Sequence, residues 1–216
     1  MTRALGWVTA VLLVGGLLMA FGVAPREVTQ GNVQRIMYLH VPAVIVAQYV
    51  AFAVVFVASI IYLSRRAEWA DRVAHASAEV GVVFMGIAIA TGAIWGKPTW
   101  GTWWTWDARL TTAAVLFVMY LGYLLLRGMV EDRERGARYA AVVGIIAALN
   151  VPLVHFSVIW WRTLHQPPTL LKPGAAATSP VILVALLVNF VAFSVLYAYF
   201  VAKRVRLLRR EQEAFA

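Results

Sequence analysis

The sequence predicts an all-α polytopic membrane protein with six transmembrane helices and both termini in the cytoplasm. Of its 216 residues, 62% are hydrophobic and only 13% are charged, and the mean hydropathy is +0.77. A soluble domain is closer to half apolar and a quarter charged. Once six spans are drawn, no room remains for a separate soluble domain, so residues 1–216 are expected to form a single domain.

Six stretches approach the length of about 20 apolar residues that a spanning helix needs. The first follows Arg3 and could be mistaken for a signal peptide, but it lacks a good cleavage site and is long enough to span. The third and fourth stretches are short. We expect spans at residues 7–23, 39–63, 78–95, 110–127, 139–157 and 180–203.

The basic residues predict the orientation of these spans. Thirteen of the 19 lysines and arginines fall at the termini and in the second and fourth connections. Cytoplasmic segments carry such an excess, so the net charge of +9 is attributed to membrane topology, and no nucleic acid is expected as a partner. Three outward segments remain: 24–42, 95–109 and 158–179. A short surface helix is expected at residues 160–165 of the last one.

Cysteine is absent from the chain, which excludes a disulfide, a thiolate metal site and thioether chemistry. A metal or cofactor must therefore be held by histidine, methionine or carboxylate side chains. Among these, neutral imidazole is the strongest ligand for iron, copper or zinc that the sequence offers.

The segment of residues 95–109, here called the tryptophan segment, reads WGKPTWGTWWTWDAR. Tryptophan favours the headgroup level of a membrane, and that preference accounts for one or two of its five tryptophans. Two glycines allow the backbone to fold tightly, so the cluster is also able to form a rigid apolar platform with N–H donors at its edges. Its natural ligand is large, flat and apolar. The tryptophans are Trp95, Trp100, Trp103, Trp104 and Trp106.

Asp107 and Arg109 end the tryptophan segment and begin the fourth span. Asp107 stands where an N-cap belongs, so its carboxylate is expected to accept unpaired N–H groups of the helix. Arg109 is expected either to pair with Asp107 or to reach an anionic group of a ligand. The other outward basic residues are also candidates to pair with carboxylates, although a contact with lipid headgroups is the simpler explanation. They are Arg35, Lys97, Arg162 and Lys172.

Three of the four histidines share the predicted outer face with the tryptophan segment. They are His40, His155 and His165, whereas His75 lies in a predicted cytoplasmic connection about a membrane thickness away. A lone histidine near a helix end is commonly a hydrogen-bonded surface residue. Two histidines on opposite sides of a flat cofactor, however, would fill both axial positions of a haem iron.

Three stretches together resemble the CcmC family of bacterial cytochrome c maturation. The tryptophan segment is similar to the "WWD" signature of haem-handling proteins, and RIMYLHVP at 35–42 and VIWWRTLHQ at 158–166 look like the two histidine motifs of this family. The stretches occur in the expected order, and the length and six-span layout are also similar.

The resemblance implies a function, a ligand set and partners. His40 and His165 would be the axial ligands of a b-type haem (bis-histidine iron), and the tryptophan segment, including Asp107 and Arg109, would contact the porphyrin on the periplasmic side of the inner membrane. Haem would pass to a periplasmic haem chaperone of the CcmE type. ATP-dependent transporter subunits (CcmA- and CcmB-like) and a small single-span protein (CcmD-like) would complete the complex in the lipid membrane. His155 matches no motif and is left out of the ligand set.

Two alternatives remain open beside a non-enzymatic haem-delivery module. A transmembrane haem transporter subunit would need a polar lining, and few ionisable groups occur away from the ends of the spans. A cytochrome c haem lyase usually has further histidines within its helices and a larger body, and here His155 is the one extra candidate.

Overall fold

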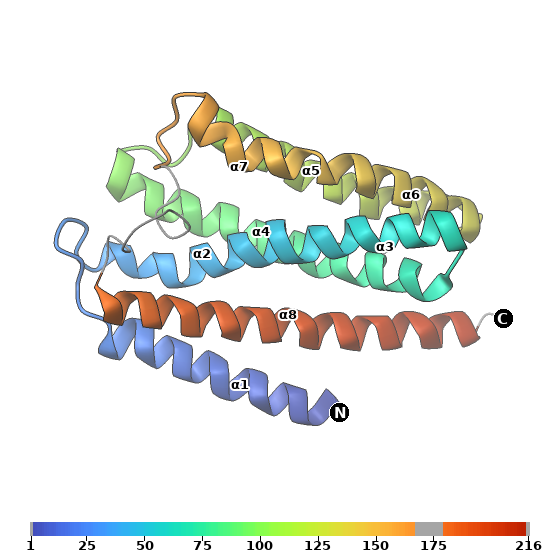
Figure 1. Cartoon of the computed structure of the whole chain (residues 1–216), viewed down its shortest axis with the longest axis horizontal. Coiled ribbons are helices and arrows are strands. Elements are labelled where there is room, and N and C mark those ends of the chain that lie inside the picture. Colours follow the sequence, from blue (N-terminus) through green and yellow to red (C-terminus); the bar gives the residue numbers. More distant parts are fainter. Residues whose placement is uncertain (1, 167–178, 215–216) are drawn as a thin grey trace.

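The computed structural model describes residues 2–166 and 179–214. Within these ranges it contains six helical spans that are long and apolar enough to cross a membrane, lying side by side in an elongated bundle (Figure 1). The predicted all-α, six-span fold is confirmed. The expectation that the third and fourth spans are short is wrong, because they reach 33 and 22 residues. Their helices continue into the polar and tryptophan-rich ends.

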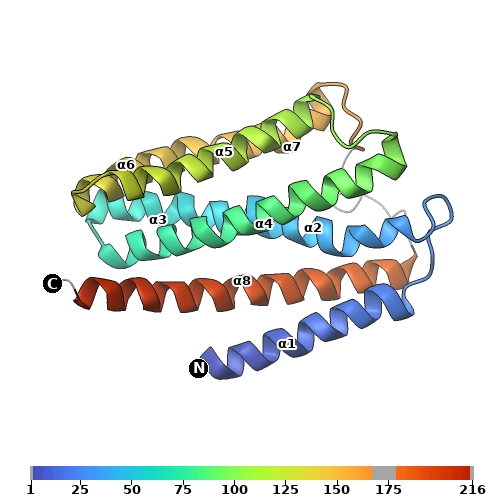
Figure 2. The same ribbon diagram turned by 180° about the vertical axis from the view of Figure 1, so that it is seen from behind.

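The first span is α1 (Thr2–Leu18), which continues into a π-helical turn, η1 (Met19–Val23). It packs along α8 (Pro180–Ala214), the last span (Figure 2). The side-chain amide of Asn189 in α8 donates to the carbonyl oxygen of Gly16 at 2.9 Å. A Cβ at Gly16 would stand 2.7 Å from Asn189 Oδ1, so the glycine permits this close contact.

The second span has three parts that follow the 3-10 turn η2 (Val33–Ile36). They are α2 (Met37–Ile45), a π-helical segment η3 (Val46–Ala51) and α3 (Phe52–Arg65). A π turn holds one residue more than an α turn, and such turns frequently occur at functional sites. After a left-handed residue at Arg66, the chain enters α4 (Glu68–Trp100), the third span.

The fourth span is α5 (Ala108–Met129), and the fifth is α6 (Arg133–Ala148) followed after Leu149 by α7 (Asn150–Trp160). Helix α5 packs against both α6 and α7. At the centre of the bundle Phe52 stacks on Tyr120, with ring centroids 3.7 Å apart.

The two ends of the bundle differ. Both termini lie at one end, here called the terminal end, and residues 24–32, 101–107 and 161–166 connect the helices at the other, here called the loop end (Figure 1). The expected helix at 160–165 is wrong, since α7 ends at Trp160 and residues 161–166 are not helical. Residues 167–178 of the last outward segment, including Lys172, lie outside the described residues.

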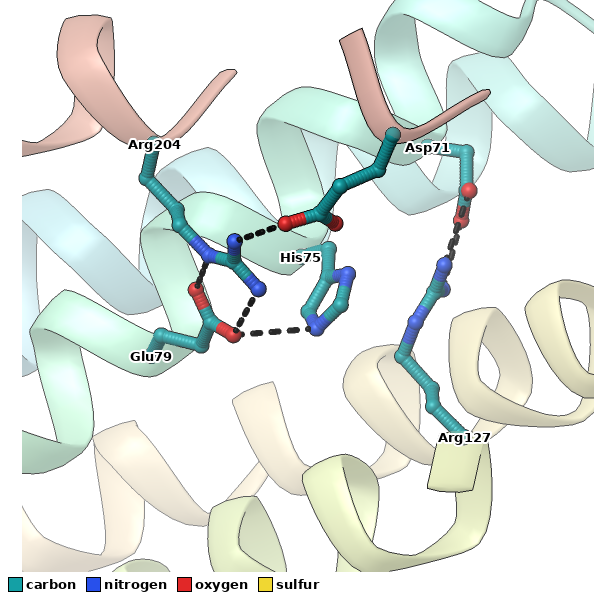
Figure 3. Close-up of polar contacts among 6 residues, drawn as sticks. Asp71, His75, Glu79, Arg127 and Arg204 are labelled. Carbon is teal, nitrogen blue, oxygen red and sulfur yellow. Dashed lines mark hydrogen bonds and ion pairs between the residues drawn. The ribbon is translucent and has the colours of Figure 1, made fainter. Parts of the chain in front are cut away.

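Ion pairs connect the helices at the terminal end (Figure 3). Arg127 of α5 makes a bidentate pair with Asp71 of α4, at 2.6 and 2.8 Å. Arg204 of α8 binds Glu79 of α4 at 2.5 and 2.9 Å, and His75 Nε2 lies 3.3 Å from the same carboxylate. His75 thus belongs to a helix, not to a connection as expected, although it lies at the end away from the tryptophans.

Candidate functional site

His40 is held on α2, one turn after that helix begins. Its Nδ1 lies 2.9 Å from the carbonyl oxygen of Ala88 and 3.2 Å from Thr91 Oγ1, both on α4. A carbonyl oxygen only accepts, so Nδ1 carries the hydrogen and Nε2 keeps its lone pair. Metal-binding histidines are oriented by such a bond to the other ring nitrogen. His40 therefore has the tautomer that a ligand needs.

Two residues of α4 define the space around the His40 ring. Trp95 contacts it edge-to-face, with ring centroids 5.8 Å apart. On the other side, a Cβ at Gly92 would stand only 2.8 Å from His40 Cε1. The glycine lets the imidazole lie directly against the helix backbone. The side chain that packs against Gly92 is therefore a candidate ligand.

The first outward segment is attached to the tryptophan segment. The carboxylate of Glu27 accepts from the backbone N–H groups of Thr29 and Gln30, closing a turn that ends at Gly31 in a left-handed conformation. The Gln30 side chain then accepts from Trp95 Nε1 at 2.8 Å. This contact fixes the Trp95 indole beside His40.

His165 lies in the loop of residues 161–166, at the loop end of the bundle. Its Nδ1 is 3.0 Å from the Gln166 carbonyl oxygen, so this imidazole also keeps its lone pair on Nε2. Trp100 contacts the ring, with centroids 6.0 Å apart. Burial lowers the pKa of His165 below its ordinary value, which favours the neutral form that binds metals.

Asp107 connects the start of α5 with the loop that carries His165. Its Oδ1 accepts from the backbone N–H of Leu110 at 2.9 Å, which confirms the predicted N-cap of α5. Its Oδ2 accepts from the backbone N–H of Leu164 at 3.0 Å. One carboxylate therefore caps a helix and fixes the residue next to His165.

Arg109 lies in the first turn of α5. Its Nη1 donates to the carbonyl oxygen of Val154 at 2.5 Å. Asp107 acts on it through its charge, and the charge of Arg109 in turn acts on both His40 and His165. His165 also acts on His40, so these side chains are close enough to influence one another electrostatically.

The five tryptophans divide into two groups. Trp95 and Trp100 contact the imidazoles, as described above. Trp103 and Trp106 are 57% and 78% exposed. Trp104 contacts Trp106 edge-to-face at 5.6 Å and buries its Nε1, which has no hydrogen-bond partner among the described residues. The tryptophans that were expected to form one platform therefore lie in two places. Trp95 and Trp100 are an inner pair beside the histidines, and Trp103 and Trp106 form an exposed outer surface.

The tryptophan segment is also less loop-like than expected. Helix α4 continues through Pro98 to Trp100, and α5 starts at Ala108. The turn at Gly101, with φ of 79° and an N–H bond to the Lys97 carbonyl, ends α4. The prediction of a loop over 95–109 is wrong at both ends. His40 lies in α2, within the span expected at residues 39–63, and this helix begins at Met37.

Arg35 is already engaged. Its guanidinium donates to the carbonyl oxygens of Ala20, Phe21 and Ala24, at 3.2 Å to Ala20 and 3.1 Å to Ala24. It therefore satisfies the end of the first span and fixes it to the start of the second. A role in binding a carboxylate does not follow from these contacts.

Sequence reasoning missed Tyr49, which lies near Arg109. The Tyr49 hydroxyl is 2.7 Å from Nδ1 of His155, the residue next to Val154, whose carbonyl oxygen accepts from Arg109. Tyr49 and His155 are 106 positions apart, and no local pattern pairs them. The presence of a tyrosine within an apolar span was the one available signal.

The residues at the loop end fit a haem group. Each of the two imidazoles carries its lone pair on Nε2, and bis-histidine ligation of a haem iron requires two such nitrogens. The inner indoles offer flat apolar surface, and the unpartnered Trp104 Nε1 offers a hydrogen-bond donor. Within the described ranges, no group of three or more His, Asp or Glu side chains that could hold a metal ion is found.

The fold and site thus define a six-span membrane protein with a histidine- and tryptophan-lined site at one end. The family model for Heme exporter protein C (CcmC) matches residues 1–216. Three relatives of that name are similar to the chain. One from Bradyrhizobium diazoefficiens is 41% identical over 96% of this chain and 80% of its own. One from Haemophilus influenzae is 38% identical over 96% and 84%. One from Escherichia coli K12 is 44% identical over 74% and 65%.

The chain therefore belongs to the Heme exporter protein C (CcmC) family. It is a multi-pass membrane protein of the haem-handling machinery of cytochrome c maturation. The family resemblance expected from the three sequence stretches is confirmed.

Proposed function

We propose that the protein holds haem non-covalently between His40 and His165 and delivers it to a periplasmic haem chaperone. The observation that carries this proposal is the pair of imidazoles. In each one Nδ1 is committed to a carbonyl oxygen, each ring contacts a tryptophan, and both lie at the same end of the bundle. Haem supplies an iron with two axial positions, and this chain supplies two neutral imidazoles.

The residues around the histidines have distinct roles in this proposal. Trp95 and Trp100 orient the imidazoles and shield them, and Trp104 Nε1 provides a donor at the edge of the site. Arg109 places its positive charge near both ligands, which suits the carboxylates of haem. Asp107 keeps the His165 loop in place.

Delivery rather than storage is supported by two features. The chain has no cysteine that would bind haem covalently, so the hold is reversible. Trp103 and Trp106 leave large apolar surfaces exposed next to the site, as a docking surface for a partner protein does. We assign this surface to the chaperone. The transporter subunits and the single-span partner belong to the same proposal, and the protein itself needs no catalytic step.

The orientation is also a proposal. Both termini share one end of the bundle, and that end carries most of the basic residues. The positive-inside rule then puts the terminal end in the cytoplasm and the histidine site at the periplasmic face. The charged side chains that lie deeper in the spans pair with one another near the terminal end, so they do not favour a haem path across the bilayer (Figure 3).

The absorption spectrum of the purified protein tests the site. Without the chaperone, the protein is expected to show the Soret and α/β bands of six-coordinate, low-spin haem. The variants His40→Ala and His165→Ala each lose one axial ligand and are expected to lose these bands or most of the bound haem.

His75→Ala is the matched control, since this histidine lies at the terminal end and should leave the spectrum unchanged. Six-coordinate spectra that persist in both His40→Ala and His165→Ala would remove the ligand assignment.

A further inference from the structure

Tyr49, Arg109 and His155 form a polar cluster that joins three different spans. Tyr49 belongs to the π-helical segment η3, Arg109 to the first turn of α5, and His155 to α7. Ionisable side chains within membrane spans are rare, and they mark functional sites more often than packing sites. No sequence motif of the haem site includes Tyr49 or His155.

Tyr49 is bonded directly to His155. The Tyr49 hydroxyl lies 2.7 Å from His155 Nδ1, and the two rings also meet edge-to-face, with centroids 5.8 Å apart. The positive charge of Arg109 acts on the same hydroxyl. Tyr49 is therefore fixed to α7 at His155.

Arg109 is held by the residue next to His155. Its Nη1 donates to the Val154 carbonyl oxygen at 2.5 Å. Two neighbouring residues of α7 therefore connect Arg109 with Tyr49, because Val154 bonds the guanidinium and His155 bonds the hydroxyl. Arg109 also lies two residues after Asp107, whose Oδ2 accepts from the N–H of Leu164 beside His165, so it begins its helix next to the His165 loop.

We propose that Tyr49 and His155 are positioning residues that aim the Arg109 guanidinium at the carboxylates of bound haem. This inference rests on the proposed function. The π turn supports it, since an extra residue in η3 changes the direction in which Tyr49 leaves the helix. An aimed guanidinium binds a carboxylate more tightly than a mobile one, because less side-chain freedom is lost on binding.

The decisive variant is Tyr49→Phe, which removes one hydroxyl and keeps the ring. We expect the six-coordinate spectrum to remain and the transfer of haem to excess apomyoglobin to become about 3- to 10-fold faster, as for the loss of one hydrogen bond. The midpoint potential of the haem should shift in the same direction as in Arg109→Gln.

Three further variants and one control sharpen the test. His155→Leu should behave like Tyr49→Phe, and His155→Gln, which can still accept from the hydroxyl, should restore most of the slow transfer. The double variant Tyr49→Phe/Arg109→Gln should release haem no faster than Arg109→Gln alone, since the hydroxyl acts through the arginine. Tyr139→Phe, an exposed tyrosine on α6, is the control and should match the unmodified protein.

A transfer rate and potential that stay unchanged in Tyr49→Phe would overturn the inference. So would rate effects of Tyr49→Phe and Arg109→Gln that multiply in the double variant, since these would show that the hydroxyl acts independently. Either result leaves the haem ligands intact. Failure of the proposed function is distinct, because it appears as persistence of the spectrum in His40→Ala and His165→Ala.

Discussion

At the scale of single residues, the packing at the loop end depends on a glycine that lies beside a histidine and a tryptophan. The imidazole of His40 lies against the backbone of α4 because Gly92 has no Cβ. The ring is then fixed by the Ala88 carbonyl on one side and by Trp95 on the other. A ligand held this closely has little freedom to move away from its position.

Gly92→Ala is expected to displace His40 and to weaken haem binding at least about 10-fold, which corresponds to roughly 1.4 kcal/mol. The helix itself should tolerate the change, since alanine is a better helix former than glycine by about 0.5–1 kcal/mol. Haem content and the Soret band measure the effect.

Gly86→Ala on the same helix is the control, because a Cβ there would meet Phe117 at an ordinary 3.8 Å. Equal haem content in both variants would contradict the role given to Gly92.

Residue patterns predicted part of this site. Asp107 as an N-cap followed from its position before the fourth span, and the structure confirms it. Charge placed His40 and His165 on the same face as the tryptophans, and each imidazole contacts one tryptophan. The residues that each of these side chains contacts could not be predicted from the sequence. Ala88 and Thr91 lie 48 and 51 positions from His40, and only the packing of α2 on α4 brings them together.

At the scale of elements, Asp107 connects the start of α5 to the His165 loop. Leu110 and Leu164 donate to different oxygens of the carboxylate, and an asparagine has an NH₂ group in place of one of them, so it cannot keep both bonds as they are. Asp107→Asn is expected to keep the fold and to release the loop, giving faster haem loss and a low-spin signal that weakens before the protein unfolds. Electron paramagnetic resonance of the oxidised protein reports this change.

Asp132→Asn offers a matched control for Asp107→Asn. Asp132 caps α6 at the terminal end, where its Oδ1 accepts from the Arg135 N–H at 2.8 Å. Asp132 lies away from the histidines, so the haem signal of Asp132→Asn should be that of the unmodified protein. Identical signals in the two asparagine variants would argue against a specific role of Asp107.

Helix boundaries were the least predictable elements. Glycine and proline in the tryptophan segment are typical of a loop, yet α4 includes Pro98 in its final turn. Around it, Thr99 Oγ1 donates to the Trp95 carbonyl and Lys97 Nζ to the Gly101 carbonyl, so side chains satisfy carbonyl groups at the end of the helix. Such compensating contacts depend on the folded geometry and have no signature in composition.

At the scale of the whole molecule, buried charge at the terminal end holds the helices together. The side chains of Arg127 and Asp71 are only 12% and 7% exposed. Arg127→Ala leaves the Asp71 carboxylate without its partner and is expected to lower the free energy of unfolding by about 3–5 kcal/mol. Denaturation in detergent, followed by circular dichroism, measures this loss.

The exposed pair of Arg209 and Glu213 on α8 provides the comparison, with 69% and 60% of the side chains exposed. Arg209→Ala should cost no more than about 1 kcal/mol. Equal losses of unfolding free energy in the two variants would show that burial of the ion pair does not contribute to stability. The haem spectrum of folded Arg127→Ala should be normal, since the histidines lie at the opposite end.

The two candidate ligands are supported unequally. His40 is part of a helix and packs on a second helix, whereas His165 lies in a loop that Asp107 fixes through the Leu164 N–H. Under the proposed function, haem exchange is therefore a sequential process with a preferred order. His165, on a loop held through Asp107, would be the residue that yields to an acceptor, and His40, packed between two helices, would keep its position.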